Sequence, residues 1–261
     1  MLKNKTALIT GSLGGIGFAT AKALAAQGCN IMLNGFADAD VIRDRQAELG
    51  RAYNVHASYH GADLRFPDQI EQLVKTTAET LGGVDIVVNN AVVRTWNPID
   101  KFRTEDWDAA IAVNLSASFH TIRLGLPYMK QASWGRIVNM GSTFSLFGVT
   151  DRVDYVTTKT GLIGLTRAVA LEVAKAGITC NAICPGQVLT PATEGRVQAE
   201  MLRDGTPREA ILTRLSARQP VGRFIDDADV AALIAFLCGP HGRDINGATL
   251  PIDGAWSAGR S

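Results

Sequence analysis

Short apolar runs alternate with longer helical patterns along the chain, and this alternation constrains the fold more than any other feature. Seven runs have the length and nearly continuous apolar character of buried strands: residues 6–10, 30–34, 54–63, 84–90, 136–142, 178–184 and 248–253. Strands of this kind, each followed by a helix, are typical of a parallel sheet that helices cover on both faces. We therefore predict an α/β fold: a single doubly wound, Rossmann-type domain over residues 1–261 with a seven-stranded parallel sheet.

Helical patterns separate these strands at residues 16–27, 39–49, 67–81, 104–125, 153–176 and 227–238. The charged segment 190–220 does not fit this alternation of strands and helices. Within it, Thr206-Pro207-Arg208-Glu209 predicts a helix that starts with a capping box and has proline at its first position. Because the segment follows the carboxyl end of a strand, where open α/β sheets bind ligands, we expect a small helical lid over a substrate. The alternative is that the segment is a surface insertion with no role in substrate binding.

A glycine-rich turn, Thr10-Gly11-Ser12-Leu13-Gly14-Gly15-Ile16-Gly17, joins the first strand to the first helix. Glycines allow the backbone to approach a diphosphate closely, and a helix N-terminus offers free N–H groups. A turn of this kind in this position favours a dinucleotide.

The end of the second strand bears on which dinucleotide is bound. It reads Leu33-Asn34-Gly35-Phe36, without the acidic residue that usually binds the ribose, and no arginine or lysine follows until Arg43. A 2′-phosphate would lack a cation there, whereas Asn34 can bond a hydroxyl and Phe36 can flank an adenine. We therefore favour NAD over NADP. Asp63 is a candidate to bind the adenine amino group. The alternative is that Asp63 only caps a helix or a turn.

Tyr155 and Lys159 are spaced to lie on one face of a helix, one turn apart. A nearby ammonium favours the phenolate form of a tyrosine, whose ordinary pKa is about 10. The pair therefore suits acid–base chemistry, although the same spacing arises by chance in many helices.

Charge and cysteine usage exclude several other classes. The net charge of +1 indicates no basic face for nucleic acid, and no apolar stretch is long enough for a signal peptide or a membrane span. The four cysteines show no C-x-x-C spacing and the four histidines form no metal signature, so we expect reduced thiols, a cytoplasmic location and no metal.

Taken together, these residues resemble the short-chain dehydrogenase/reductase family over essentially the whole chain. Val92 departs from the pattern, because the family usually has glycine there. In chain order, the residues that carry the resemblance are Thr10, Gly11, Gly15, Gly17, Asp63, Asn89, Asn90, Ala91, Asn114, Ser142, Tyr155, Lys159, Pro185, Gly186 and Thr190.

The resemblance implies a role for each catalytic candidate. Tyr155 would exchange a proton with the substrate oxygen as hydride moves to or from a nicotinamide, and Lys159 would lower the pKa of Tyr155 and bond the ribose. Ser142 would hold the substrate oxygen, and Asn114 would anchor a water that links Lys159 to solvent. The implied cofactor-binding residues are Gly11, Leu13, Gly15, Ile16, Gly17, Asn34, Phe36, Asp63, Leu64, Asn90, Ala91, Tyr155, Lys159, Pro185, Gly186, Val188 and Thr190.

Within the family, the chain is most similar to bacterial D-3-hydroxybutyrate dehydrogenases, which use NAD. Their substrate pocket is usually lined by Gln, His, Lys, Trp and Gln, and all five matching positions differ here: Arg94, Phe144, Arg152, Gln187 and Arg196. Two arginines can grip an anion bidentately, so we expect a small anionic hydroxy acid. Alternatively, Arg94 and Arg152 point to solvent or pair with Asp151, Asp154 or Glu194.

The sequence thus predicts an NAD-dependent oxidoreductase that interconverts a small secondary alcohol and its ketone. The alternatives are an NAD(P)-dependent enzyme for a neutral cyclic or larger carbonyl compound, and a catalytically silent nucleotide-binding protein. The resemblance also implies a homotetramer that pairs the helices at 104–125 and 153–176, with the Asp253–Trp256 end at a subunit contact.

Overall fold

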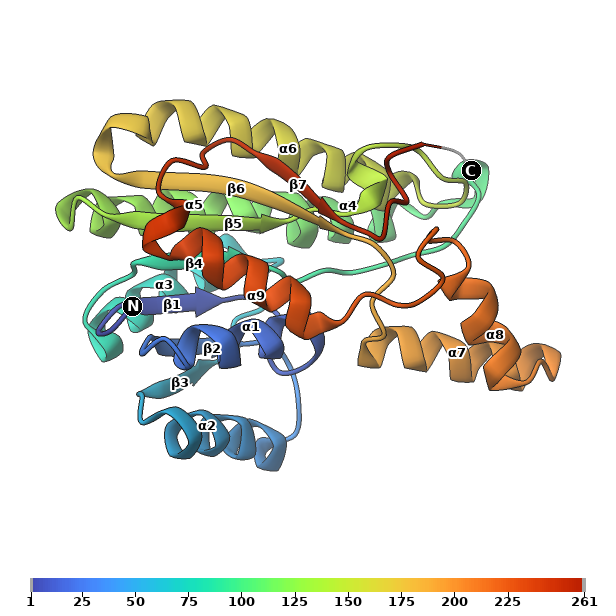
Figure 1. Ribbon diagram of the computed structural model, residues 1–261, viewed down its shortest axis with the longest axis horizontal. Coiled ribbons are helices and arrows are strands. Elements are labelled where there is room, and N and C mark those ends of the chain that lie inside the picture. Colours follow the sequence, from blue (N-terminus) through green and yellow to red (C-terminus); the bar gives the residue numbers. More distant parts are fainter. Residues whose placement is uncertain (1, 260–261) are drawn as a thin grey trace.

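A computed structural model of the protein describes residues 2–259, and within them seven strands form one parallel sheet in the order β3-β2-β1-β4-β5-β6-β7 (Figure 1). The predicted fold class is confirmed, and the third strand is shorter than expected. The bounds are β1 Thr6–Ile9, β2 Asn30–Asn34, β3 Ala57–His60, β4 Ile86–Asn89, β5 Gly135–Met140, β6 Ile178–Pro185 and β7 Thr249–Ile252.

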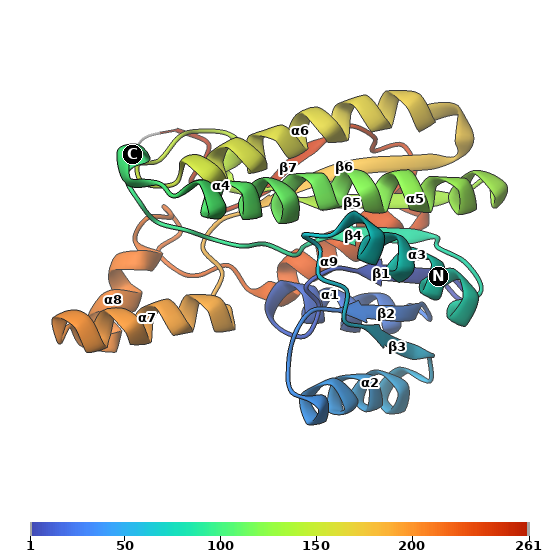
Figure 2. The ribbon, with the colours of Figure 1, turned by 180° about the vertical axis from the view of Figure 1, so that it is seen from behind.

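Helices cover both faces of the sheet, as Figures 1 and 2 show from opposite sides. One layer contains α1, α2 and α9, and the other contains α3, α5 and α6. The bounds are α1 Gly15–Ala25, α2 Ala39–Tyr53, α3 Pro67–Leu81, α4 Thr104–Ile111, α5 Ala117–Gln131, α6 Val153–Val173, α7 Pro191–Asp204, α8 Arg208–Ser216 and α9 Asp227–Cys238. None of the helices within residues 2–259 is long and apolar enough to cross a membrane.

The near-continuous apolar character of the strands follows from this two-sided burial. Successive strand residues point to opposite faces, so Ile31 and Leu33 of β2 pack in the core under α1 and α9, whereas Met32 packs in the core under α3 and α5. Both cores exclude water. A central strand therefore cannot alternate apolar and polar residues, as strands do in a sheet with one face exposed to solvent.

Two predicted helix boundaries are wrong. The pattern at 104–125 is not one helix, because a π-helical turn at Ala112–Ser116 separates α4 from α5, which continues to Gln131. The capping box at Thr206 does not form. Pro207 itself is the N-cap of α8, and no side-chain cap bond is present there. The insertion starts its first helix instead at Thr190, whose hydroxyl accepts a hydrogen bond from the N–H of Thr193 at 3.2 Å, with Pro191 at the first helical position.

The glycine turn packs directly against the neighbouring strand end. The order of the sheet reverses between β1 and β4, which is where open α/β sheets form a crevice for ligands. Asn90, just after β4, donates hydrogen bonds to the carbonyls of Thr10 and Gly11 at 3.0 and 2.8 Å. A Cβ at Gly17 would lie 2.3 Å from the Gly11 carbonyl oxygen, so only glycine fits at that position.

We expect Gly17→Ala to lower the free energy of unfolding by about 1–3 kcal/mol, because the added methyl group meets rigid backbone. The same substitution at Gly195, which lies within α7, is the matched control, because an added methyl group there would meet nothing within 4 Å beyond the nearby backbone of its own helix. Gly195→Ala should instead stabilise the protein by about 0.5–1 kcal/mol. Urea unfolding measures both, and equal midpoints for the two variants would contradict the close-approach argument.

Candidate active site

The junction of β5 and α6 brings together Ser142, Tyr155 and Lys159. Ser142 follows β5 and caps a short 3₁₀ turn, where its Oγ accepts a hydrogen bond from the N–H of Phe144 at 3.2 Å. Ser145 completes the turn: its Oγ accepts from the Ser142 N–H at 3.1 Å and donates to the Lys159 carbonyl at 2.8 Å. The end of the strand is thereby tied to the first turns of α6, which carry Tyr155 and Lys159.

Lys159 is buried, and its Nζ donates a hydrogen bond to the Met140 carbonyl, at the end of β5, at a distance of 2.5 Å. The ammonium also lies 5.6 Å from the centre of the Tyr155 ring. Burial lowers the pKa of Lys159, and the phenol opposes that shift. The lysine therefore places a charge near the phenol in a region that excludes most water.

Tyr155 is also buried, and the groups around it favour its phenolate. Burial alone raises the pKa of Tyr155, but the positive charges of Lys159, Arg94 and Arg152, together with a hydrogen bond from Ser142, outweigh it. The pKa of Tyr155 is thus below its ordinary value. A tyrosine in this state can exchange a proton nearer to neutral pH than a free phenol can.

Asn114 lies in the π-helical turn between α4 and α5, a kind of irregularity that is frequent at functional sites. Its Oδ1 accepts from the Val93 N–H at 2.8 Å and its Nδ2 donates to the Val93 carbonyl at 3.1 Å. These two bonds fix the segment that leads into Arg94.

A cavity of about 280 Å³ lies along the glycine turn. The N-terminus of α1 opens onto it, which suits a diphosphate. A Cβ at Gly15 would come within 3.2 Å of Thr190, so the absence of side chains is what keeps the space open. The residues present therefore fit a dinucleotide. Of the predicted cofactor residues, this cavity brings together Gly11, Gly15, Ile16, Gly17, Asn90, Ala91, Lys159, Pro185 and Thr190.

The remaining predicted cofactor residues occupy neighbouring positions. Gly186 and Val188 line a second cavity together with Tyr155, and Leu13 packs against the core beside Gly35. A third hollow beside the glycine turn is lined by Asn34, Phe36, Asp63 and Leu64.

In this third hollow, two predicted contacts of the adenosine half have protein partners. The side-chain amide of Asn34 is buried and donates to the carbonyls of His60 and Ala62, both at 3.0 Å, so these N–H groups are not available to a ribose. Asp63 accepts from the guanidinium of Arg65, and this hydrogen bond lowers its pKa. Arg65 also lines the hollow. The sequence next to the second strand gives no sign of this cation, because Arg65 lies some thirty residues further along the chain.

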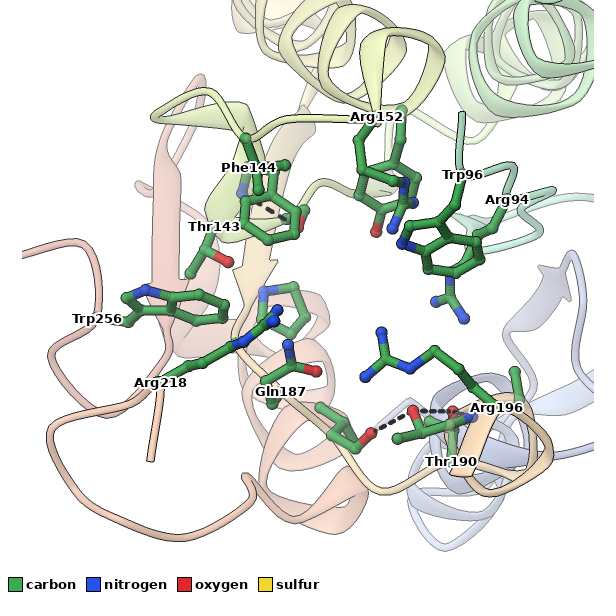
Figure 3. A pocket seen from close by; sticks show the side chains of 18 of the residues that line it. Arg94, Trp96, Thr143, Phe144, Arg152, Gln187, Thr190, Arg196, Arg218 and Trp256 are labelled. Atoms are coloured by element: carbon green, nitrogen blue, oxygen red, sulfur yellow. Dashed lines mark hydrogen bonds between the residues drawn. The ribbon is translucent and has the colours of Figure 1, made fainter. Parts of the chain in front are cut away.

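The second cavity, of about 290 Å³, adjoins the glycine-turn cavity and holds Ser142 and Tyr155 (Figure 3). All five positions that the sequence singled out for substrate line it: Arg94, Phe144, Arg152, Gln187 and Arg196. The structure adds Trp96, Arg218 and Trp256, which sequence reasoning missed. Trp256 lies 5.4 Å from Phe144, ring centre to ring centre, so the C-terminal end forms part of this wall.

The cavity arginines have no carboxylate partner. Among residues 2–259, no ion pair includes Arg94, Arg152, Arg196 or Arg218, and Glu194 is held by Arg208 at 2.8 Å. Arg94 and Arg152 thus form no ion pair with Asp151, Asp154 or Glu194. Of the other alternative, exposure to solvent, Arg152 is buried but Arg94 is exposed. In the same part of the chain, no group of three or more His, Cys, Asp or Glu side chains is arranged to hold a metal ion.

Comparison with known proteins places this geometry in a family. The family model described as enoyl-(acyl carrier protein) reductase matches residues 11–257. The chain belongs to the short-chain dehydrogenase/reductase family, a family of oxidoreductases, as its motifs predicted.

Individual relatives cover nearly the whole chain. The D-beta-hydroxybutyrate dehydrogenase of Cupriavidus necator is 45% identical over 259 residues, covering 99% of this chain and 100% of its own, and that of Rhizobium meliloti is 43% identical over 255 residues, covering 97% and 99%. Among solved structures, L-sorbose reductase from Gluconobacter frateurii, complexed with NADPH and L-sorbose, aligns with a TM-score of 0.94 at 26% identity, covering 99% of this chain and 98% of that one.

We expect Arg94→Gln to raise the pKa of Tyr155, because it removes one of the positive charges that favour the phenolate. An ultraviolet difference titration of tyrosinate, with Tyr155→Phe as the reference, isolates this phenol from the other three tyrosines. The matched control is Arg203→Gln on the exposed surface of α7, where the guanidinium bonds Asp204. Titration of Tyr155 at the same pH in wild type and Arg94→Gln would contradict this electrostatic account.

Proposed function

We propose that the protein is an NAD-dependent oxidoreductase that interconverts a small hydroxy acid, similar to 3-hydroxybutyrate, and its keto acid. One observation carries the proposal: Tyr155 and Lys159, one helical turn apart on α6, line two adjoining cavities. Tyr155 and Ser142 line the arginine-rich cavity, whereas Lys159 lines the glycine-turn cavity. A substrate and a dinucleotide in these two spaces would meet at this phenol.

The chain's own residues account for the proton in this reaction. In the direction of oxidation, the Tyr155 phenolate takes the hydroxyl proton of the substrate while Ser142 holds the substrate oxygen. The glycine-turn residues would hold a nicotinamide dinucleotide, which would supply the acceptor for the hydride of the carbinol carbon; with the C–H hydride and the O–H proton both removed, the substrate would become a carbonyl compound. Lys159 keeps the phenol acidic and lies next to the cofactor cavity. Asn114, through Val93, holds the segment that carries Arg94 against the site.

Three further properties are part of the proposal. Helices α7 and α8 extend beyond the carboxyl ends of the strands (Figure 1), which suits a lid over the substrate cavity. The exposed apolar residues Phe119 of α5 and Leu171 of α6 suit the helix pairing of a homotetramer. The four free, buried cysteines suit a reducing cytoplasm.

The rings of Phe144 and Trp256, which line the cavity and pack against Phe147, favour a second candidate substrate class. A neutral cyclic or larger carbonyl compound would pack against these rings without using the arginines. Turnover of cyclic alcohols but not of hydroxy acids would select this alternative.

Absorbance of the reduced nicotinamide, measured with NAD and a panel of hydroxy acids and cyclic alcohols, tests the proposal directly. We expect oxidation of a hydroxy acid, with kcat reduced about 10²–10⁴-fold in Tyr155→Phe because the acid–base group is lost. Tyr53→Phe, at the far end of α2, removes the same hydroxyl outside the site and should retain activity. Unchanged kcat in Tyr155→Phe would contradict the assigned role.

For the cofactor, we expect kcat/KM with NAD to exceed that with NADP by about tenfold or more, because a 2′-phosphate requires cationic partners. The nearby guanidinium groups are already engaged: Arg65 pairs with Asp63 and Arg43 pairs with Asp40. Parallel assays with the two cofactors at equal concentration give the ratio. A ratio below one would show that Arg65 leaves Asp63 to bind the phosphate.

A further inference from the structure

Four arginines converge on the substrate cavity from separate parts of the chain. Arg94 follows β4, Arg152 precedes α6, Arg196 lies on α7 and Arg218 follows α8. Figure 3 shows the guanidinium groups of Arg94, Arg196 and Arg218 extending into the same space. Among the described residues that line this cavity, Asp151 contributes the single carboxylate.

Two of these guanidinium groups, those of buried Arg152 and half-buried Arg196, retain unused hydrogen-bonding capacity away from water, whereas Arg94 and Arg218 are exposed. Arg152 is only 6% exposed, and its Nε and one Nη are buried without a hydrogen-bond partner, as is one Nη of Arg196. Arg152 stacks on the rings of Trp96 and Tyr155 at 4.0 and 4.3 Å from their centres, so it cannot turn to solvent. A buried, unpaired charge is costly, and an anionic ligand is the group that would relieve this cost.

Mutual repulsion adds to that cost. Burial lowers the pKa of Arg152 to about 10; Tyr155 and Asp154 oppose this decrease, and the smaller contributions of Arg94 and Arg196 add to it. Burial also lowers the pKa of Arg196, and the charge of Arg218 is the largest electrostatic contribution in the same direction. Burial raises the pKa of Asp154, two residues after Arg152, and this weakens its carboxyl group as a counter-ion.

The four charges divide into two groups. Arg94 and Arg152 both act on Tyr155 and so lie on the catalytic side, whereas Arg196 and Arg218 come from the α7–α8 region. Arg94 also lines the glycine-turn cavity and can serve a dinucleotide, but Arg196 and Arg218 line the substrate cavity without lining that one. A substrate with a single carboxylate near Tyr155 would leave the charges of Arg196 and Arg218 without a counter-ion.

We propose that the substrate is a hydroxy dicarboxylate, with one carboxylate bound on the Arg152 side and the second bound by Arg196 and Arg218. This inference rests on the proposed function and adds the second anionic group to it. The planar forks of arginine match carboxylates. The cavity of about 290 Å³ lies just below the usual range of about 300–1,000 Å³ for ligand sites, so the carbon chain is short.

Binding of unreactive acids tests the second carboxylate independently of turnover. Isothermal titration of the NADH-saturated protein would compare butyrate with succinate, pentanoate with glutarate and hexanoate with adipate. We expect at least one diacid to bind about tenfold or more tightly than its matched monoacid. Arg196→Gln and Arg218→Gln should each reduce that ratio towards one. Arg203→Gln, an exposed arginine on the same helix as Arg196, should leave the ratio unchanged.

Two binding outcomes would overturn the inference. Diacids that bind no better than their monoacids in all three pairs would remove the second anion site. A diacid preference that survives both Arg196→Gln and Arg218→Gln would place that site elsewhere. Circular dichroism of each variant, compared with wild type, establishes that a lost preference is not lost folding.

Turnover separates this inference from the proposed function. Malate differs from 3-hydroxybutyrate, and 3-hydroxyglutarate from 3-hydroxypentanoate, by a carboxylate in place of a methyl group. Preferential oxidation of the diacids supports both proposals. Equal or better oxidation of the monoacids keeps the proposed function and overturns the dicarboxylate. Tight diacid binding without oxidation of any hydroxy acid supports the second anion site and overturns the proposed function.

Discussion

The bond between the Lys159 ammonium and the Met140 carbonyl is the interaction on which the site depends. A buried ammonium needs polar partners, because desolvation otherwise drives it to lose its proton. The strand end supplies one such partner, and Ser145 links the same turn to the backbone carbonyl of Lys159. These two connections fix α6 against β5, and Tyr155, one helical turn before Lys159, is fixed with them. The position of the phenol is thus set by the sheet and not by a loop.

This arrangement concentrates positive charge where a folded protein would ordinarily avoid it. Lys159 and four arginines surround one phenol and the cavity beside it, with few carboxylates to balance them. Such repulsion is tolerable because the stability of the chain comes from elsewhere, namely the two apolar cores on either face of the sheet. The same positive charges favour a phenolate at Tyr155 and would attract an anion into the cavity. Destabilising charge and function are here the same feature.

The fold could be predicted from the sequence because its signals are local. Apolar runs such as residues 30–34 mark a two-sided strand, and the turn at Gly11–Gly17 marks where the first strand meets a helix. The Tyr155–Lys159 spacing likewise needs only one helix. Contacts between distant segments could not be predicted in this way. Trp256 reaches Phe144 across more than a hundred residues, and Arg218 enters the cavity from beyond α8. The π-helical turn that carries Asn114 also has no period that distinguishes it from a continuous helix.

The residues that local sequence signals predict and those that depend on distant contacts have different proposed roles in the site. The groups proposed to act on the proton lie on α6 and directly after β5, where a shift would disturb the core. The arginines lie instead on the segment after β4, the turn before α6, helix α7 and the segment after α8, which carry few of the core contacts. Substitutions there can change the charge of the cavity without moving Tyr155. The proposed dicarboxylate specificity therefore requires no change at Tyr155 or Lys159 in a chain that is 45% identical to a D-beta-hydroxybutyrate dehydrogenase.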